Sequence, residues 1–164
     1  MSKLYSAVEP LAHAWTKFFI WSYPRGLGLL AGHAYLLLET KGRRTSVTRV
    51  TPLGYVRWGS HFLVQPLHGA GSSWVRNLLA CPRVEVMVGL GRLSCTARVM
   101  DDVAERLDAL RVIGASRTVS GLTARRYFSL LGKADEDRLG RASHDLDKLV
   151  VLLETDPIDN PGRR

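Results

Sequence analysis

The chain has 164 residues, 46% of them hydrophobic and 23% charged, which is ordinary for a folded soluble protein and excludes a disordered one. We predict a single domain over residues 1–164. Its two cysteines are too few for a disulfide framework, and no Cys or His spacing resembles a zinc site, so we expect no metal and a reduced, cytoplasmic setting. The net charge is +8, and residues 1–100 alone hold 12 Lys and Arg against three Asp and Glu. Such a one-sided positive field attracts nucleic acid, an anionic membrane surface or a small molecule with phosphates or carboxylates.

The first 25 residues predict an amphipathic helix. Apolar residues recur at three- and four-residue steps from Leu4 to Trp21, and Tyr23–Gly26 then breaks the pattern. Two interpretations stay open: the helix covers one end of the core, or it lies on a membrane surface, because aromatic residues gather at its end. The most apolar segment, Gly26–Leu38, is shorter than the about 20 apolar residues needed to cross a bilayer. We therefore expect at most a peripheral contact with the inner face of a membrane.

Short segments with the composition and alternation of β-strands follow. The expected strands are 34–40, 48–57, 61–65, 84–88, 92–100 and 148–154. The second and third join at a tight turn, as do the fourth and fifth, so both pairs predict hairpins. Pro52 cannot donate a hydrogen bond within a sheet, and it therefore predicts an edge or a bulge at that point.

Helices are expected between and after these strands. A serine cap predicts a short helix over 74–79, which Pro82 stops, and further helices are expected from Asp101 onward, over 120–132 and over 135–145. Residues 158–164 form a polar tail. The alternating strand–helix rhythm of a parallel sheet is absent. We therefore predict a small closed or partly closed barrel with flanking helices.

The segment Lys41–Arg49 is the strongest candidate for a binding site. It holds four cationic side chains within nine residues, three hydroxyl residues and no acid. Guanidinium forks and backbone N–H groups at the mouth of a barrel suit a phosphate or several carboxylates. The alternative is a solvated hairpin turn that is basic by chance.

A second candidate is the glycine loop Gly69–Gly71 and the helix start after it. Unsatisfied N–H groups at a capped helix start favour an anion. Trp74 and Asn77 lie one helical turn apart, so an aromatic face and an amide could contact one ligand. The alternative is that Trp74 belongs to the core and Asn77 satisfies a loop.

Four stretches in a fixed order, at 36–45, 49–55, 74–78 and 81–86, resemble the deazaflavin-dependent nitroreductase and F420H2-dependent quinone reductase family. The resemblance implies a mainly β fold with flanking helices, a six-stranded antiparallel split β-barrel like that of FMN-binding proteins. It implies that reduced coenzyme F420 donates a hydride to a quinone, a nitro compound or an activated C=C bond. By this resemblance the coenzyme-binding residues are Lys41, Arg43, Arg44, Thr45, Arg49, Thr51, Pro52, Leu53, Gly69, Ala70, Gly71, Trp74 and Asn77.

Residues that act on the acceptor are less well marked. The family's substrate-facing tyrosines have no aligned counterpart, so His68 and Tyr127 are the candidate catalytic proton donors. The acceptor is expected to be a quinone, a nitroaromatic or an unsaturated lipid-like molecule, and the protein a monomer or homodimer.

Three alternatives remain. They are a non-catalytic barrel that stores a deazaflavin, haem or fatty acid, an FMN-dependent oxidase on the same fold, and a nucleic-acid-binding module. The last is disfavoured because no aromatic residues are interleaved with the basic ones at Lys41–Arg49.

Overall fold

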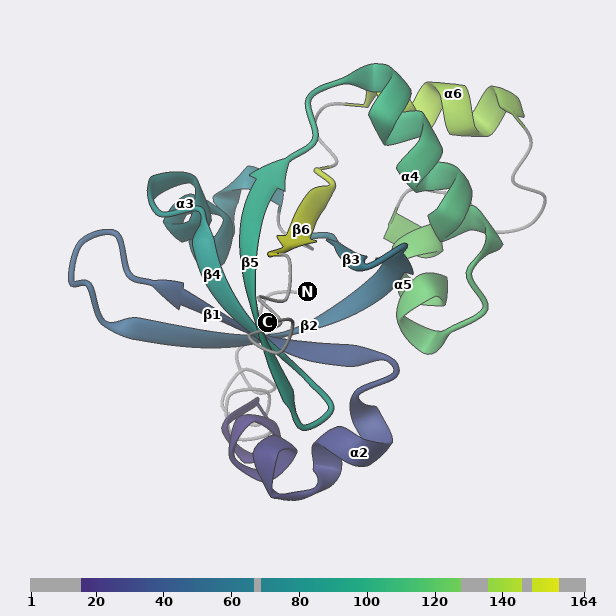
Figure 1. Cartoon of the computed structure of the whole chain (residues 1–164). Coiled ribbons are helices and arrows are strands. Elements are labelled where there is room, and N and C mark those ends of the chain that lie inside the picture. Colours follow the sequence, from purple (N-terminus) through teal and green to yellow (C-terminus); the bar gives the residue numbers. More distant parts are fainter. Residues whose placement is uncertain (1–15, 67–68, 128–135, 146–148, 157–164) are drawn as a thin grey trace, which may run out of the picture.

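The structure is a computed structural model that describes residues 16–66, 69–127, 136–145 and 149–156 (Figure 1). Six antiparallel strands close into a barrel in the order β1-β2-β3-β6-β5-β4. The strands are β1 (Tyr35–Lys41), β2 (Thr48–Trp58), β3 (His61–Val64), β4 (Arg83–Val88), β5 (Gly91–Val99) and β6 (Val151–Thr155). The predicted fold class, a six-stranded antiparallel barrel with flanking helices, is confirmed.

The position of Pro52 shows how the barrel accommodates a proline in a long strand. Along β2, Pro52 pairs with Leu37 of β1, whereas β3 pairs only with the segment Tyr55–Trp58. The other side of β2 therefore has no strand partner at Pro52, and the missing N–H costs no ladder hydrogen bond there. This local edge is what the sequence predicted.

The interior of the barrel is apolar and is closed at one end by α3 (Ser73–Ala80). Leu36, Leu38, Phe62 and other inward-facing strand residues form one core cluster with Trp74 and Leu78 of α3. This helix ends at Ala80, two residues before Pro82, as predicted. Because α3 contacts β1, its side chains lie close to the start of the basic β1–β2 loop.

Three further helices lie together on the other side of the barrel (Figure 1). They are α4 (Val103–Ala115), α5 (Val119–Tyr127) and α6 (Glu136–His144). The side chain of Asp102 caps α4 by accepting a hydrogen bond of 2.8 Å from the Glu105 N–H. The prediction of a helix over 120–132 agrees with α5 as far as the structure describes it, since residues 128–135 lie outside the described part.

The N-terminal segment packs beneath the barrel. Residues 16–22 are helical and lead through the 3-10 turn η1 (Tyr23–Arg25) into α2 (Leu27–Ala31). Tyr23 is completely buried, and its hydroxyl donates to the Tyr35 carbonyl at 2.6 Å and accepts from the Gly89 N–H at 3.1 Å. The earlier part of the predicted helix, Leu4–Trp15, lies outside the described residues. None of the helices among the described residues has the length and apolar character to cross a membrane.

Candidate functional site

The basic segment Lys41–Arg49 forms an ordered turn that joins β1 to β2, and we call it the basic turn. The Ser46 N–H donates to the Gly42 carbonyl at 2.7 Å, and the Gly42 N–H donates to the Val47 carbonyl at 2.9 Å. Ser46 adopts a left-handed conformation with φ of 56°, which a polar residue tolerates better than a bulky apolar one. The turn presents the guanidinium groups of Arg43, Arg44 and Arg49 to solvent.

Asn77 of α3 ties this turn to the body of the protein. Its side-chain oxygen accepts a hydrogen bond from the Arg43 N–H at 3.3 Å, and its side-chain nitrogen donates to the Thr40 hydroxyl at 3.3 Å. Asn77 is 6% exposed and Thr40 is 1% exposed. The amide therefore satisfies hydrogen-bonding groups at the start of the loop, as one of the two sequence interpretations held. Asn77 also lines the cavity described next.

A cavity of about 490 Å³ lies between the basic turn and α3. This volume is within the range of about 300–1,000 Å³ that is usual for small-molecule sites. The residues that line it come from the turn, from the start of β2 and from α3: Gly42, Arg43, Arg44, Thr45, Arg49, Val50, Thr51, Ser73, Trp74 and Asn77. These lining residues include three arginines and no acid, so the cavity favours an anion that bears an apolar or aromatic part.

Seven of the predicted coenzyme residues meet in this cavity: Arg43, Arg44, Thr45, Arg49, Thr51, Trp74 and Asn77. Trp74 belongs to the core cluster, as one of the two sequence interpretations held, and it also lines the cavity. Gly42, Val50 and Ser73 were missed. Gly42 and Val50 were within reach of sequence reasoning because they lie between predicted residues, and Ser73 directly precedes the predicted helix over 74–79.

Other predicted residues lie elsewhere. Pro52 points to the opposite face of β2 from Thr51 and lines a smaller pocket with Phe19 and Tyr35. Leu53 packs against the core of the barrel. Lys41 lines a separate pocket together with the carboxylates Glu39 and Glu85.

The glycine loop is adjacent to the cavity but does not line it. Gly69–Gly71 forms the 3-10 turn η2, and Gly69 has a φ of 52°, which favours glycine. The Arg76 side chain donates to the Gly71 carbonyl at 2.8 Å and holds the turn against α3. Among the described residues around the cavity, none belongs to this turn.

The structure does not test the two catalytic candidates. His68 lies outside the described residues. Tyr127 ends α5, but its side chain is likewise outside the described part. The other end of α5 lies against β2, where the Ser120 hydroxyl donates to the Tyr55 carbonyl at 2.7 Å. Both residues stay predictions.

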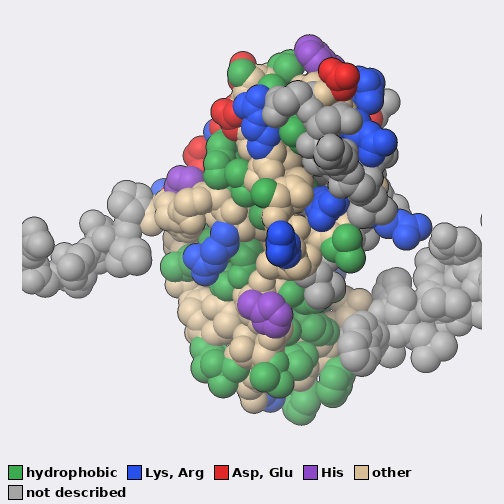
Figure 2. Space-filling view, turned by 90° about the vertical axis from the view of Figure 1, so that its right-hand side faces the viewer, with side chains coloured by type: hydrophobic (Ala, Val, Ile, Leu, Met, Phe, Trp, Pro, Cys, Tyr) green, Lys and Arg blue, Asp and Glu red, His purple; other side chains and the backbone are tan. Residues whose placement is uncertain are grey.

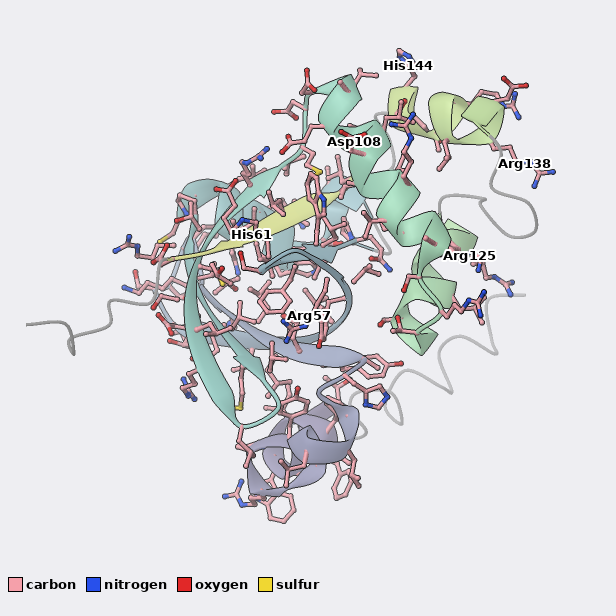
Figure 3. The ribbon with its side chains drawn as sticks, turned by 45° about the vertical axis from the view of Figure 1, so that its right-hand side comes forward. Arg57, His61, Asp108, Arg125, Arg138 and His144 are labelled. Carbon is pink, nitrogen blue, oxygen red and sulfur yellow. The ribbon has the colours of Figure 1, made fainter. Side chains whose placement is uncertain are left out.

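A second cavity, of about 570 Å³, was not predicted. It lies near the far end of β2 and is lined by Gly32, His33, Tyr55, Val56, Arg57, Val112, Ala115, Ser116 and Thr118. Figure 3 shows this side of the molecule, with Arg57 on the barrel and Arg125 on α5. The second cavity is slightly larger than the first but is lined by a single arginine, Arg57. The first cavity, with three arginines, is therefore the better match for a multiply charged anion.

Comparison with known proteins agrees with the geometry. The family model for F420H(2)-dependent quinone reductase matches residues 23–121. The F420H(2)-dependent quinone reductases Rv1261c and MT1299 of two Mycobacterium tuberculosis strains are each 41% identical over 66 residues, which is 38% of this chain and 44% of theirs. The chain thus matches these curated relatives over less than half of their length.

Solved structures share the fold. The F420-H2 dependent reductase FDR-A has a TM-score of 0.52 at 21% identity, with 74% of this chain and 94% of that chain covered. The conserved hypothetical protein Rv2991 of Mycobacterium tuberculosis has a TM-score of 0.52 at 15% identity, with 79% and 77% covered. The family match spans more than half of the sequence and includes the basic turn, β2 and α3. The chain belongs to the F420H(2)-dependent quinone reductase family.

Proposed function

We propose that this protein is an F420H2-dependent oxidoreductase whose coenzyme binds in the cavity between the basic turn and α3. One observation carries the proposal. Three guanidinium groups from the β1–β2 hairpin and the indole of Trp74 from α3 line a single cavity. A coenzyme with an anionic tail and a flat aromatic ring needs both surfaces side by side.

The donor set fits such a coenzyme. Arg43, Arg44 and Arg49 offer planar, permanently charged forks that bind phosphate and carboxylate groups in two-point fashion. The hydroxyls of Thr45 and Thr51 add neutral donors at the same cavity. Trp74 provides an apolar wall that is itself fixed in the core, so the ring would meet a rigid surface.

The chemistry of the reaction would come from the coenzyme, which supplies a hydride in its reduced form. The protein would bind the anionic tail, orient the ring and keep water from the reacting face. The positive field of the arginines would stabilise negative charge that develops on the acceptor. His68 and Tyr127 remain candidates for the proton that completes the reduction.

For the acceptor we propose a quinone, the substrate that the family description names. A nitro compound or an activated C=C bond would accept a hydride in the same geometry. A barrel that only stores a deazaflavin, haem or fatty acid, and an FMN-dependent oxidase, are the alternatives that the assay must separate.

The test is an anaerobic assay in which the full chain is mixed with reduced F420 and a soluble quinone. We expect protein-dependent oxidation of the deazaflavin, with one quinone reduced for each coenzyme oxidised. Binding of F420 without turnover of any quinone, nitroaromatic or enone would favour storage. Oxidation of reduced FMN but not of reduced F420 would favour the oxidase and would contradict the proposal.

A further inference from the structure

A group of exposed apolar side chains lies at the lower end of the molecule, formed by helix 16–22, α2 and the β4–β5 turn. Its members are Phe18, Trp21, Leu29, Leu30 and Leu90, and we call this surface the apolar tip. Leu29 and Leu30 are 70% and 74% exposed, and Phe18 and Trp21 are 53% and 56% exposed. Figure 2 shows hydrophobic side chains gathered at this end. A contiguous exposed patch of this kind marks a contact with a protein or a membrane.

The helix over residues 16–22 is apolar on both of its faces. Phe19, Ile20 and the following Tyr23 face the barrel, where they join a core cluster with Leu37 and Met87. The opposite face carries Phe18 and Trp21, whose rings lie 6.2 Å apart. A surface helix in water normally has a mainly polar outer face, whereas this helix places two exposed aromatic rings there beside Lys17.

The apolar tip is held rigidly against the barrel. A Cβ added at Gly28 would lie 2.4 Å from the Gly89 carbonyl oxygen, and one at Gly32 would lie 2.6 Å from the Gly89 nitrogen. These glycines therefore let α2 pack directly on the β4–β5 turn. The exposed leucines of α2 thus project from a fixed platform, which lowers the conformational cost of binding.

The charges around the apolar tip are positive. Lys17 and Arg25 are exposed, and the sequence has no Asp or Glu between Glu9 and Glu39. The Arg25 guanidinium lies over the Trp21 ring, 4.6 Å from its centre, so the two side chains make a cation–π contact. In Figure 2 the acidic side chains in view lie at the opposite end of the molecule.

We infer that the apolar tip docks on an anionic lipid bilayer, with Phe18, Trp21, Leu29 and Leu30 at the level of the acyl-chain boundary and Lys17 and Arg25 among the headgroups. Aromatic and leucine side chains flanked by basic residues are the composition of interfacial segments. A symmetric dimer through the same surface would bring Lys17 and Arg25 of two copies together, and the described residues of helix 16–22, α2 and the β4–β5 turn include no acid to pair them. Charge complementarity thus favours the bilayer.

This inference depends on the surface and not on the proposed reaction. If the acceptor is a lipid-soluble quinone, docking would bring the enzyme to the phase in which that acceptor is dissolved. The two proposals can fail separately, because vesicle binding needs no coenzyme and coenzyme binding needs no vesicle.

The experiment is flotation of the full chain with vesicles of phosphatidylcholine alone or mixed with phosphatidylglycerol. We expect binding to the mixed vesicles and weaker binding to the neutral ones. The double variant Leu29→Ser/Leu30→Ser should bind at least about tenfold more weakly, because each buried methylene contributes roughly fourfold. The matched control Leu122→Ser removes an exposed leucine from α5 and should bind like the wild type.

A second variant tests the charge. Lys17→Gln should weaken binding to the mixed vesicles by about fivefold and leave binding to neutral vesicles unchanged. Coenzyme titration should be unaffected in all these variants, which also shows that they fold. Equal vesicle binding by wild type and double variant would overturn the inference. So would a wild-type dimer in sedimentation that the double variant converts to monomer, because a second copy would then cover the apolar tip.

Discussion

Removing the Asn77 amide should destabilise the fold and release the basic turn. In Asn77→Ala the buried Thr40 hydroxyl loses the side-chain nitrogen that donates to it, and the Arg43 N–H loses its acceptor. A buried polar group left without a partner costs about 1–3 kcal/mol, whereas the partly exposed Arg43 N–H can bond to water. Alanine regains about 0.5 kcal/mol through its higher helix propensity. We therefore expect the free energy of unfolding to fall by about 1–2 kcal/mol.

A double-mutant cycle isolates the contact. Thr40→Val keeps the side-chain volume and removes the hydroxyl, so the double variant with Asn77→Ala leaves no unpaired group at Thr40. Urea unfolding of the wild type and the three variants should give a coupling energy of about 1 kcal/mol. Additive effects within about 0.3 kcal/mol would mean that the 3.3 Å contact between Asn77 and Thr40 does not hold the turn.

Three further predictions concern the rest of the fold. Gly28→Ala should lower the free energy of unfolding in the urea assay by about 1–3 kcal/mol, because its Cβ would lie 2.4 Å from a main-chain oxygen of the β4–β5 turn. The control Gly140→Ala on α6 would place its Cβ in open space, with nothing within 4 Å, and should raise the free energy of unfolding by up to about 1 kcal/mol. Burial raises the pKa of the Cys95 thiol to about 12, so Ellman's reagent at about pH 8 should titrate only Cys81 in the native protein; two fast thiols would mean an open barrel. The Arg98 side chain on β5 donates hydrogen bonds to the Glu105 carboxylate and holds its pKa below the usual value. The ionised carboxylate therefore stabilises the fold at pH values above the usual glutamate pKa, and this stabilisation is lost as the pH falls through the lowered pKa. Thermal melts should show Glu105→Gln less stable than the wild type near pH 7, with a difference that shrinks as the pH falls below the usual glutamate pKa of about 4.3; a constant difference would contradict the linkage.

The strands were predictable because their signals are local. Alternating apolar residues and the turns at Gly59 and Gly89, both with positive φ, mark the hairpins without knowledge of the rest of the fold. The last strand begins at Val151, whereas the prediction also included Leu149 and Val150, because apolar residues just before a strand look like part of it. The predicted first residue, Lys148, lies outside the described residues.

The site was predictable in part. Thr51, Pro52 and Leu53 were assigned together because they form one motif, yet successive strand residues point to opposite faces. The alternation in β2 could have separated Thr51, which lines the cavity, from Pro52, which does not.

The partners of Asn77 could not be predicted. Its amide contacts Arg43 and Thr40, which precede it by 34 and 37 residues in the chain. Such a contact depends on how α3 packs across the end of the barrel, and no pattern near Asn77 encodes it.

The central claim, that the cavity between the basic turn and α3 holds the coenzyme, is tested most directly by titration of F420 into single-arginine variants. Arg43→Ala and Arg49→Ala should each weaken binding by about 1.5–3 kcal/mol, because each removes charge-assisted hydrogen bonds to the anionic tail. The control Arg57→Ala makes the same change of charge on β2 at the second cavity and should leave the affinity within about twofold. Unchanged affinity in both Arg43→Ala and Arg49→Ala, or an equal loss in all three variants, would contradict the account.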